Sequence, residues 1–559
     1  MRSVLERSAR RLGALARTAP TRLYAATRAQ VPAGLRAVPA LPLPADPGLA
    51  AEFYQGHYPL GGSTITCGPE GPFALRGAPE PWLDALHGFA WLRHFGSARG
   101  ELYRVHARAT VKDWIAQPGE RLPAGAKPAI RAARLCAWIV NGPFLLQNAG
   151  PDFEREFLGS LGRQARSLSA TVQGFARPEE RLQSATVLCL AALALKGFES
   201  ERAAAFALLE RELDQQILPD GGHLSRSPQT LLARACDLLL VRLAAEHLRL
   251  ELPRPIFGTL DRMLSMLRYL QHGDGGLATF NGVCDHTPAL LRIVLDAAGE
   301  TSSRIPARAP YSGYSRLAAG DTCLIADTGL PPPAGWNVMA APAPGAFELS
   351  DGLQRLVVNC GAPADPTSPW ASAARLTAAH STAEIGAASA AVAVQPALLA
   401  RLLGSPAYLG LTDCRTELDD SPLGSMISTV HDGYAGRFGC WHERRLFLSA
   451  GGADLRGEDR FRCRDGDVQR PEFAIRFHLH PSVRLSEDES QSGLRLHGSA
   501  GDWLFRCRGG QLSIEESVSL ADHPAPQRTG QIVIRGRIGD TERVTWSFRK
   551  LLELPPETT

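Results

Sequence analysis

Apolar residues recur every three or four positions through the first half of the chain, which is the spacing of amphipathic helices. Between residues 79 and 299 this pattern predicts a series of helices joined by short polar breaks, with no convincing strand. Consecutive helices with short connections pack antiparallel, and a long series of such hairpins closes into a solenoid or a toroid. The expected helices are Trp82–Phe95, Leu102–Ala116, Lys127–Leu146, Asp152–Ala170, Pro178–Lys196, Glu201–Gln216, Pro228–Leu248, Pro253–Tyr269 and His286–Ala298.

The second half of the chain has a different pattern, which begins near Ala309. Short or alternating apolar runs appear there, bounded by Gly, Asp and Pro, and such runs predict the short strands of a sandwich or barrel. A helix-rich stretch followed by a strand-rich stretch indicates segregated domains. The expected strands are Thr322–Ala326, Ala346–Leu349, Leu356–Asn359, Met426–Val430, Arg445–Leu448, Ala474–Leu479, Gly493–Leu496, Trp503–Cys507, Gln511–Glu515, Gln531–Gly536 and Val544–Phe548.

These patterns divide the chain into four parts. We expect a basic N-terminal arm over residues 1–36 and an extended, Pro- and Gly-rich lead-in over residues 37–78. A helical toroid is expected over residues 79–305 and a strand-rich sandwich over residues 306–559.

The composition excludes several classes of protein. A formal charge of +3 over 559 residues, with no basic patch in the body of the chain, argues against a nucleic-acid binder. No stretch of about 20 apolar residues predicts a transmembrane segment, and no apolar run marks a secretory signal. The first 36 residues hold eight Arg and one Glu. Val4–Ala26 is therefore either a basic amphipathic helix in peripheral contact with a membrane or a solvated arm.

The 11 cysteines are scattered singly and form no CxxC pair, so a thiolate zinc site or redox motif is not expected. Cys189, Cys323 and Cys360 lie in apolar stretches and are interpreted as small buried hydrophobes. Unpaired thiols favour a reducing compartment. The sequence also contains no GxSxG, P-loop, HExxH or dinucleotide-binding motif.

Two connections between expected helices share one motif. Asp220-Gly221-Gly222-His223 lies in the first, and Asp274-Gly275-Gly276 follows His272 in the second. Paired glycines permit tight turns and a close approach of the backbone to a ligand. They also serve simply to end helices, and the motif alone leaves both interpretations open.

Several longer stretches, taken together, resemble the heparinase II/III-like proteins, especially an alphaproteobacterial branch of that family. The resemblance covers about residues 80–550. It rests on HGFAWLRHF from His87, RLCAWIVNGPFLL from Arg134, ILPDGGHLSRSP from Ile217, HGDGGLATFNG from His272, SGYSRL from Ser312, FELSDG from Phe347, LVVNCGAP from Leu356, AAHSTAEI from Ala378, HDGYAGRFG from His431 and RFHLHPSV from Arg476. The resemblance implies an (α/α) toroid followed by an antiparallel β-sandwich. It also implies cleavage of an acidic, uronate-containing polysaccharide by β-elimination.

β-Elimination requires a base at C5 of the uronate, an acid for the leaving oxygen, and donors that neutralise the carboxylate. The resemblance puts forward His223, His431 and Tyr434 for proton transfer. The candidate substrate-binding residues are Gln183, Arg226, Gln229, His272, Asp274, Asn281, Trp91 and Arg134. Each candidate also has a structural interpretation: a histidine bonded to a nearby carbonyl, an arginine tied to a helix end, a packed tyrosine with a satisfied hydroxyl, or a core tryptophan.

The sequence departs from the family pattern at several of these positions. Gln183 stands where studied members carry an Asn-His pair, and Gln229 and Thr230 follow Ser-Pro where a tyrosine is usual. His380 resembles a zinc ligand of the family, but the other ligands are replaced by residues 343–346 and Asn359. We therefore expect no zinc and no other cofactor.

His478 and His480 form a further histidine pair. They stand two residues apart in RFHLH, which on a strand puts both on one face. Such a pair either binds a metal or packs under a loop, and no third ligand is apparent.

Two functional hypotheses follow. The chain is either a polysaccharide lyase or a non-catalytic glycan-binding or exopolysaccharide-assembly factor with the same fold. Convergence of His223, Arg226 and Tyr434 favours the enzyme, whereas their scattering or burial favours the second hypothesis. The resemblance implies a location in the cell envelope or periplasm, and the lack of a visible signal peptide keeps the cytoplasm as the alternative.

Overall fold

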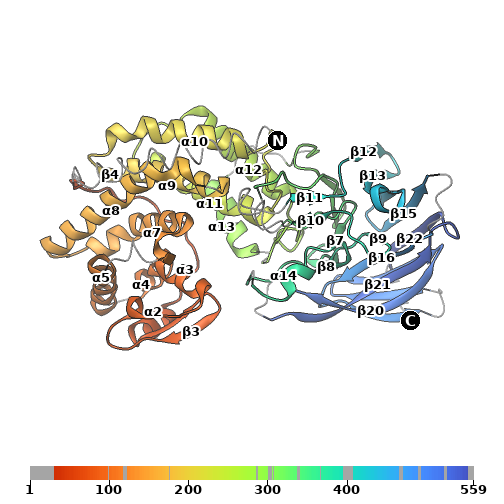
Figure 1. The fold of residues 1–559 in the computed structure, drawn as a ribbon, viewed down its shortest axis with the longest axis horizontal. Helices are drawn as coiled ribbons and strands as arrows, with labels where there is room; N and C mark the ends of the chain where they lie inside the picture. Colours follow the sequence, from red (N-terminus) through yellow and green to blue (C-terminus); the bar gives the residue numbers. More distant parts are fainter. Residues whose placement is uncertain are drawn as a thin grey trace, which may run out of the picture. The chain divides into compact units, whose positions relative to one another are not determined.

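The computed structural model describes residues 31–551, apart from residues 99, 118–122, 176, 285–286, 300–304, 306–307, 337–339, 366, 395–406, 465–469, 489–492 and 522–524. The expected amphipathic helix Val4–Ala26 lies outside the described residues. The contacts of the chain define two compact units (Figure 1). The helical unit comprises residues 1–216, 233–260 and 293–300, and the strand unit comprises residues 217–232, 261–292 and 301–559.

The helical unit is built from consecutive helices, as the apolar spacing predicts. The helices that begin at Pro128, Pro151 and Pro178 carry this proline in their first turn, where its missing N–H costs no helical hydrogen bond. The helices are α2 (Pro47–Tyr54), α3 (Glu80–Gly88), α4 (Leu92–Ser97), α5 (Glu101–Ala116), α6 (Pro123–Ala126), α7 (Pro128–Leu146), α8 (Pro151–Thr171), α9 (Pro178–Ala194) and α10 (Arg202–Gln216). The border between the units runs through α11 (Pro228–His247), α12 (Arg254–Tyr269) and α13 (Pro288–Ala298).

The first expected helix, Trp82–Phe95, is interrupted. Phe89 has a φ of 59° and ends α3 in the left-handed conformation, and α4 resumes at Leu92. The earlier helix α2 was not predicted, because its stretch is rich in Pro and Gly. Asp46 caps it by accepting a hydrogen bond from the Gly48 N–H at 2.7 Å.

Helix α7 is long and apolar enough to cross a membrane by length and composition, with a mean hydropathy of 1.2. Nearly half of that stretch, 44%, is buried inside the protein. Its buried residues include Leu135, Trp138 and Ile139, which are fully enclosed. A core helix of this kind passes the same test as a membrane span, so α7 is weak evidence for one.

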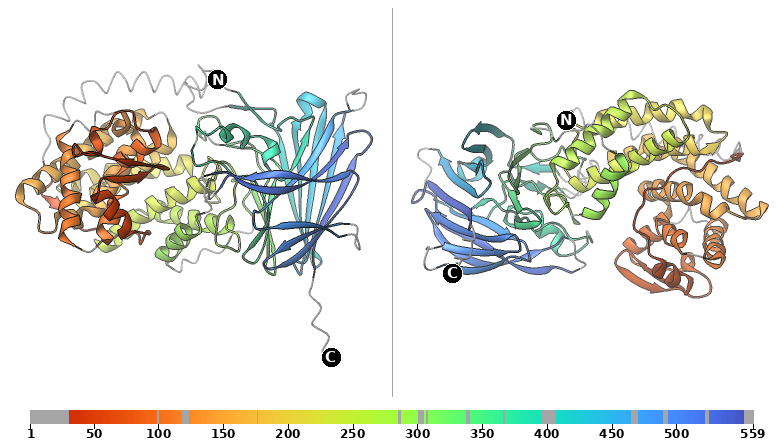
Figure 2. Two further views of the ribbon diagram at one scale, coloured as in Figure 1. Left: turned by 90° about the horizontal axis from the view of Figure 1, so that it is seen from below. Right: turned by 180° about the vertical axis from the view of Figure 1, so that it is seen from behind.

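The strand unit contains two large antiparallel sheets (Figure 2). One has the order β12-β13-β14-β15-β22-β19-β18-β17, and the other has the order β20-β21-β16-β8-β7-β6-β5, with β9 added beside β16. The first sheet contains β12 (Cys414–Ser421), β13 (Gly424–Tyr434), β14 (Cys440–Ser449), β15 (Asp454–Cys463), β17 (Arg484–Asp488), β18 (Gly493–Gly498), β19 (Gly501–Arg508) and β22 (Arg543–Lys550). The second contains β5 (Tyr314–Ala319), β6 (Thr322–Asp327), β7 (Phe347–Asp351), β8 (Gln354–Val358), β9 (Ala383–Ile385), β16 (Glu472–Leu479), β20 (Gln511–Ser519) and β21 (Gln527–Arg537).

The core of the strand unit lies between the two sheets. Phe347 on β7 stacks on Trp546 on β22, with ring centroids 5.5 Å apart and an interplanar angle of 6°. Phe477 on β16 packs against Phe505 and Phe548 of the other sheet. Side chains that meet across two stacked sheets define a β-sandwich, so the predicted fold class of helical toroid and antiparallel sandwich is confirmed.

One pair of cysteines differs from the expectation that all are unpaired. Cys440 on β14 and Cys463 on β15 face each other across the sheet, with Cα atoms 4.0 Å apart, and form a disulfide. The sequence did not reveal this pair, because 23 positions separate the two cysteines and the strand register that joins them is not visible in the spacing. Other cysteines, including Cys189, Cys323 and Cys360, are free and buried as expected.

Removal of this disulfide is expected to destabilise the strand unit by about 3 kcal/mol, because the bond closes a loop in the unfolded chain. The measurement compares urea unfolding of the wild type with that of the double variant Cys440→Ser/Cys463→Ser under oxidising conditions. Cys67→Ser, at a free and partly exposed cysteine, is the matched control. Equal unfolding midpoints for the wild type and the double variant would contradict a stabilising role.

Candidate functional site

The DGGH motif forms a tight loop that is fixed to the strand unit. The Leu218 N–H donates to the Gly222 carbonyl at 2.7 Å, and the Gly221 N–H donates to the Leu218 carbonyl at 2.9 Å. Gly221 has a φ of 92°, and a Cβ there would lie 2.0 Å from the Arg262 carbonyl oxygen, so only glycine fits. The Asp220 carboxylate accepts hydrogen bonds from Gly222 and from both the N–H and the hydroxyl of Ser312.

His223 and Arg226 follow this loop, and both are buried. The Ser225 N–H donates to His223 Nδ1 at 3.1 Å, which leaves the proton of the neutral imidazole on Nε2. The Arg226 guanidinium donates to the carbonyls of Ser312, Gly313 and Leu330, each at 2.8 Å, and to Asp327 Oδ1 at 2.6 Å. It also lies over the ring of Tyr314 at 4.8 Å. The guanidinium N–H groups of Arg226 thus donate to groups of the protein itself.

The second loop repeats the first bond for bond. The His272 N–H donates to Gly276, the Gly275 N–H donates to His272, and Asp274 Oδ1 accepts from the Gly276 N–H. Asp274 then pairs with Arg355 on β8 through two bonds of 2.7 and 3.1 Å. In both loops the aspartate closes the turn and anchors it to the sandwich, so the shared DGG motif has a structural explanation.

A buried carboxylate, Glu348, lies beneath the second loop. It accepts hydrogen bonds from the backbone N–H groups of Thr279 and Asn359, and it lies 3.2 Å from His272 Nε2. Burial alone would raise the pKa of Glu348, but His272 and the charge of Arg355 lower it to about 2. Burial and the charge of Arg355 oppose protonation of His272, yet its contacts with Cys323 and Glu348 raise its pKa. These groups form one charged network inside the strand unit.

Asn281 and Gln229, two further binding candidates, form hydrogen bonds within the strand unit. Asn281 donates to the Tyr314 hydroxyl at 2.8 Å and accepts from the Ala341 N–H at 3.2 Å. The Tyr314 hydroxyl in turn donates to the Arg226 carbonyl. Gln229 accepts from the Cys284 N–H at 3.0 Å. The structure therefore brings Arg226 and Asn281 together through Tyr314.

His431 belongs to a separate network between the two sheets. The Gly433 N–H donates to His431 Nδ1, so the proton on His431 Nε2 faces His442 Nδ1 at 3.1 Å. His442 Nε2 then donates to Asp459 at 2.7 Å, and Asp459 pairs with Arg444 through bonds of 2.7 and 3.1 Å. Burial, followed by the charges of His442 and Arg444, lowers the pKa of His431 well below its usual value.

Tyr434 lies in the buried core of the same unit. Its side chain is 1% exposed, and its hydroxyl donates to the Ala383 carbonyl at 2.8 Å. Burial raises the pKa of this phenol. Two of the three residues chosen as a test of convergence, Tyr434 and Arg226, therefore have separate and internal partners.

The remaining substrate-binding candidates belong to the helical unit. Arg134 is fully buried, donates to Gln164 at 2.8 Å and lies 4.2 Å from the Trp114 ring. Trp91 is 3% exposed and donates to the Leu86 carbonyl at 3.0 Å. Gln183, on α9, is only partly buried. A role in binding remains a prediction for all three.

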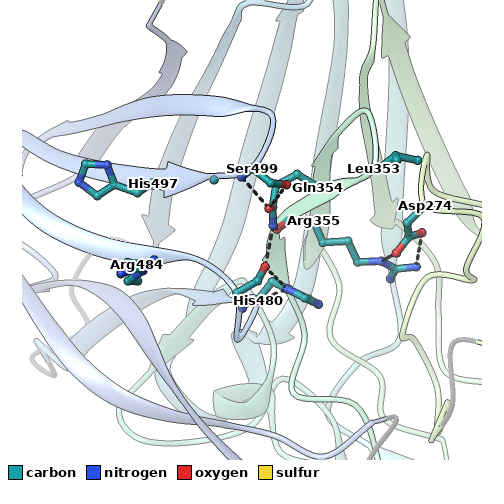
Figure 3. Close-up of a pocket in the computed structure, with 10 residues that line it drawn as sticks. Asp274, Leu353, Gln354, Arg355, His480, Arg484, His497 and Ser499 are labelled. Atoms are coloured by element: carbon teal, nitrogen blue, oxygen red, sulfur yellow. Dashed lines mark hydrogen bonds and ion pairs between the residues drawn. The ribbon is translucent and has the colours of Figure 1, made fainter.

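An open pocket lies in the strand unit, where the β7–β8 turn, the loop before β17 and the β18–β19 turn meet (Figure 3). Its volume is about 450 Å³. The pocket is lined mainly by polar residues: Asp274, Leu353, Gln354, Arg355, His480, Ser482, Arg484, His497, Gly498 and Ser499.

Comparison with known proteins identifies the chain. Residues 301–547 match the family described as "Heparinase II/III-like, C-terminal". FtsZ-localized protein C of Caulobacter vibrioides is 30% identical over 534 residues, which cover 93% of this chain and 91% of that protein. The chain belongs to the heparinase II/III-like family.

Solved structures support the same fold. Heparinase III is similar with a TM-score of 0.67 and 15% identity, over 87% of this chain and 80% of that one. A mutant of heparan sulfate lyase HepC from Pedobacter heparinus has a TM-score of 0.62 and 15% identity, over 92% and 85% of the two chains. At this identity the likeness shows the heparinase II/III-like fold alone.

His380, which resembles a zinc ligand of the heparinase II/III-like family, is buried, and its Nδ1 lies 2.9 Å from the Leu376 carbonyl. Within the described part of the chain, no three His, Cys, Asp or Glu residues are grouped to hold a metal ion. The residues around His380 therefore do not fit the family's zinc site.

Sequence reasoning did not select the partners that fix the candidates, chiefly Asp327, Glu348 and Arg355. Glu348 stands in the FELSDG stretch that carries the family resemblance, and this was the available signal. Among the pocket residues, Arg484 was not selected, and His480 was considered only together with His478, as a pair that either binds a metal or packs under a loop. His478 and His480 have different environments because β16 ends at Leu479, which leaves His478 buried and His480 at the pocket.

Proposed function

We propose that this chain is a non-catalytic member of the heparinase II/III-like family that acts as an accessory protein localised with FtsZ. The burial of Tyr434 carries the first part of the proposal. A general base must reach the proton that it removes, whereas the Tyr434 hydroxyl is enclosed and bonded to Ala383. Its raised pKa also opposes formation of the phenolate.

The other candidates for β-elimination support the same conclusion. His431 is enclosed in the sandwich core, and its lowered pKa keeps it neutral. Arg226 directs its guanidinium to Asp327 and to backbone carbonyls. Both side chains therefore have partners inside the protein that account for their positions, and neither position requires a bound polysaccharide.

The similarity to FtsZ-localized protein C supports the second part of the proposal, because it extends over nearly the whole of both chains. Whole-length similarity makes a shared site of action a stronger inference than a shared fold alone.

A glycan-binding factor of the envelope is the second candidate function, and the disulfide Cys440–Cys463 favours it. Disulfides persist in oxidising compartments such as the periplasm and are rare in the cytoplasm. The predicted acidic-polysaccharide partner and envelope location belong to this candidate.

The purified protein is expected to release no unsaturated uronate from acidic polysaccharides, because its buried candidates cannot reach a substrate. The measurement is the ultraviolet absorbance of that product during incubation with heparan sulfate, chondroitin and the producer's own exopolymer. A heparinase serves as the positive control. An absorbance rise that is lost in Tyr434→Phe or His223→Ala would overturn the non-catalytic proposal.

The localisation is tested with a fluorescent fusion of the full chain in cells that carry a second label on FtsZ. We expect the two labels to coincide and the fusion to disperse after FtsZ depletion, whereas the fluorescent protein alone stays diffuse. Protease accessibility in spheroplasts separates the two candidate compartments. A fusion that stays away from FtsZ would refute the localisation and leave the absorbance result standing.

A further inference from the structure

The outer face of the first sheet is rich in arginine. On β14 and β15, alternate residues such as Leu446 and Leu455 lie in the sandwich core, so the residues between them face outward. The strand register extends this face over β22 and β19. Its arginines are Arg445, Arg456, Arg460, Arg462, Arg543, Arg549, Arg506 and Arg508. The sequence alone does not reveal this surface, because its arginines come from different strands.

The far side of the same face is acidic. The edge strand β12 carries Glu417 and Asp419, and both side chains are exposed. Glu417 stands in the same cross-strand row as Arg445, which places it on the outer face. Arg415, on the same strand, is paired with Asp413 at 2.9 Å. The face therefore changes from acidic at β12 to basic at β22 and β19.

The rows that cross from β14 to β15 join side chains that attract each other. A carboxylate binds a guanidinium through charge-assisted hydrogen bonds, and an aromatic ring attracts a guanidinium that lies over its face. The rows are Trp441–Arg462, Glu443–Arg460, Arg445–Glu458 and Phe447–Arg456. Each row therefore has one member of an attracting pair on either side of the line between the two strands.

A twofold axis along this line makes the face complementary to itself. The rotation sets β14 of one copy over β15 of the other, so every attracting pair is repeated between the copies. In the sheet order β12-β13-β14-β15-β22-β19 the line lies at the centre, so β12 of one copy meets β19 of the other. Glu417 and Arg508 lie at opposite ends of one row. Glu417 therefore faces Arg508 of the second copy.

The charges within one copy leave this match incomplete. Glu443 and Glu458 are each bound by more than one arginine, in the ion pairs Glu443–Arg445, Glu443–Arg462, Glu458–Arg460 and Glu458–Arg543. The arginines of β15, β22 and β19 therefore outnumber the carboxylates beside them. The acidic β12 strand of a second copy supplies carboxylates on the side where they are lacking.

We propose that two copies of this chain associate through this face, with the twofold axis between β14 and β15. The strands from β12 to β19 cover roughly 24 Å by 30 Å, or about 700 Å² per copy, from the usual strand spacing and rise. A standard-size stable interface buries about 800 Å² per partner. The interface lies on the strand unit and uses none of the candidate acid–base residues.

The test is sedimentation velocity of the full chain over a range of protein and salt concentrations. We expect a dimer of twice the 60.1 kDa mass of one chain, which dissociates as salt screens its ion pairs. Glu417→Arg and Arg508→Glu each place like charges opposite one another, twice in the dimer. Each should raise the dissociation constant roughly tenfold or more. The double variant restores opposite charges, so its dissociation constant should return close to that of the wild type.

Arg537→Glu is the matched control, because it reverses the charge of an exposed arginine on β21 of the other sheet. It should leave the dissociation constant unchanged. A chain that sediments as a monomer at every concentration and salt would overturn the proposal. A dimer that neither single substitution weakens would place the interface elsewhere. A double variant that associates no better than the single variants would show that Glu417 and Arg508 do not face each other, which also overturns the proposal.

Discussion

The strand unit is expected to lose stability as the pH falls from 6.5 to 4, and His478→Gln is expected to remove part of that loss. Burial, followed by the charges of His380 and Arg476, lowers the pKa of His478 to about 3. The unfolded chain, with a histidine pKa near 6.5, binds a proton in this range that the folded chain does not. The contribution of His478 to the free energy of unfolding is therefore fully present above pH 6.5. Below pH 6.5 the free energy of unfolding falls by about 1.4 kcal/mol per pH unit, or roughly 3 kcal/mol by pH 4.

Other groups leave the sign of this effect unchanged. His431 and His442 also have lowered pKa values because of burial, so they add to the same loss. The pKa of His272 is raised, so protonated His272 stabilises the folded state fully below the unfolded pKa of about 6.5. This stabilisation is lost only as the pH rises above that value, so it does not change between pH 6.5 and 4. The pKa of Glu348 is lowered to about 2, so the stability that its carboxylate contributes is lost only when the pH falls below the unfolded pKa of about 4.

Hydrogen exchange of peptides from β16 and β21 measures this effect in the strand unit itself. Gln retains an N–H donor for the Ala378 carbonyl, which lies 3.0 Å from His478 Nε2, and it does not titrate. The pH dependence should therefore be shallower in His478→Gln than in the wild type. His247→Gln, at an exposed histidine on α11, is the matched control. The same slope in all three proteins would refute the assignment to His478.

The elements of the fold could be predicted because each depends on local spacing. The strand Thr322–Ala326 was expected and is observed as β6, and the helix Leu102–Ala116 is observed as α5. The break at Phe89 escaped prediction because a left-handed residue other than Gly, Asn or Asp has no clear sequence signal. Where such a residue is held by tertiary packing, apolar spacing continues through the break.

The candidate site could be predicted only in part, because the sequence names residues but does not name their partners. The two DGG loops were recognised as a pair, and the structure explains the motif. Arg226 and Asp327 are separated by 101 positions, and Asp274 and Arg355 by 81. Whether a histidine or arginine faces a ligand or the core is decided by such distant contacts, and these follow from the packing of the sandwich.

Arg226→Met is expected to destabilise the strand unit by roughly 3–5 kcal/mol, because it leaves the buried Asp327 carboxylate without its ion pair. Asp327 is 1% exposed and lies 2.6 Å from Arg226. Gly313 and Gly329 make room for the guanidinium, since a Cβ on either would lie within 3.2 Å of Arg226 Nη2. A methionine fills the space of the side chain but replaces none of its hydrogen bonds.

The double variant Arg226→Met/Asp327→Asn separates a structural role from a ligand-binding one. It removes both charges, so its loss of stability should be well below that of Arg226→Met alone. Urea unfolding, followed by hydrogen exchange of β5 and β6, measures both variants. If Arg226 instead bound a polysaccharide, Arg226→Met would weaken binding and leave the unfolding free energy nearly unchanged. A large loss of stability that Asp327→Asn partly reverses would therefore show that Arg226 has a structural role beside the first DGG loop.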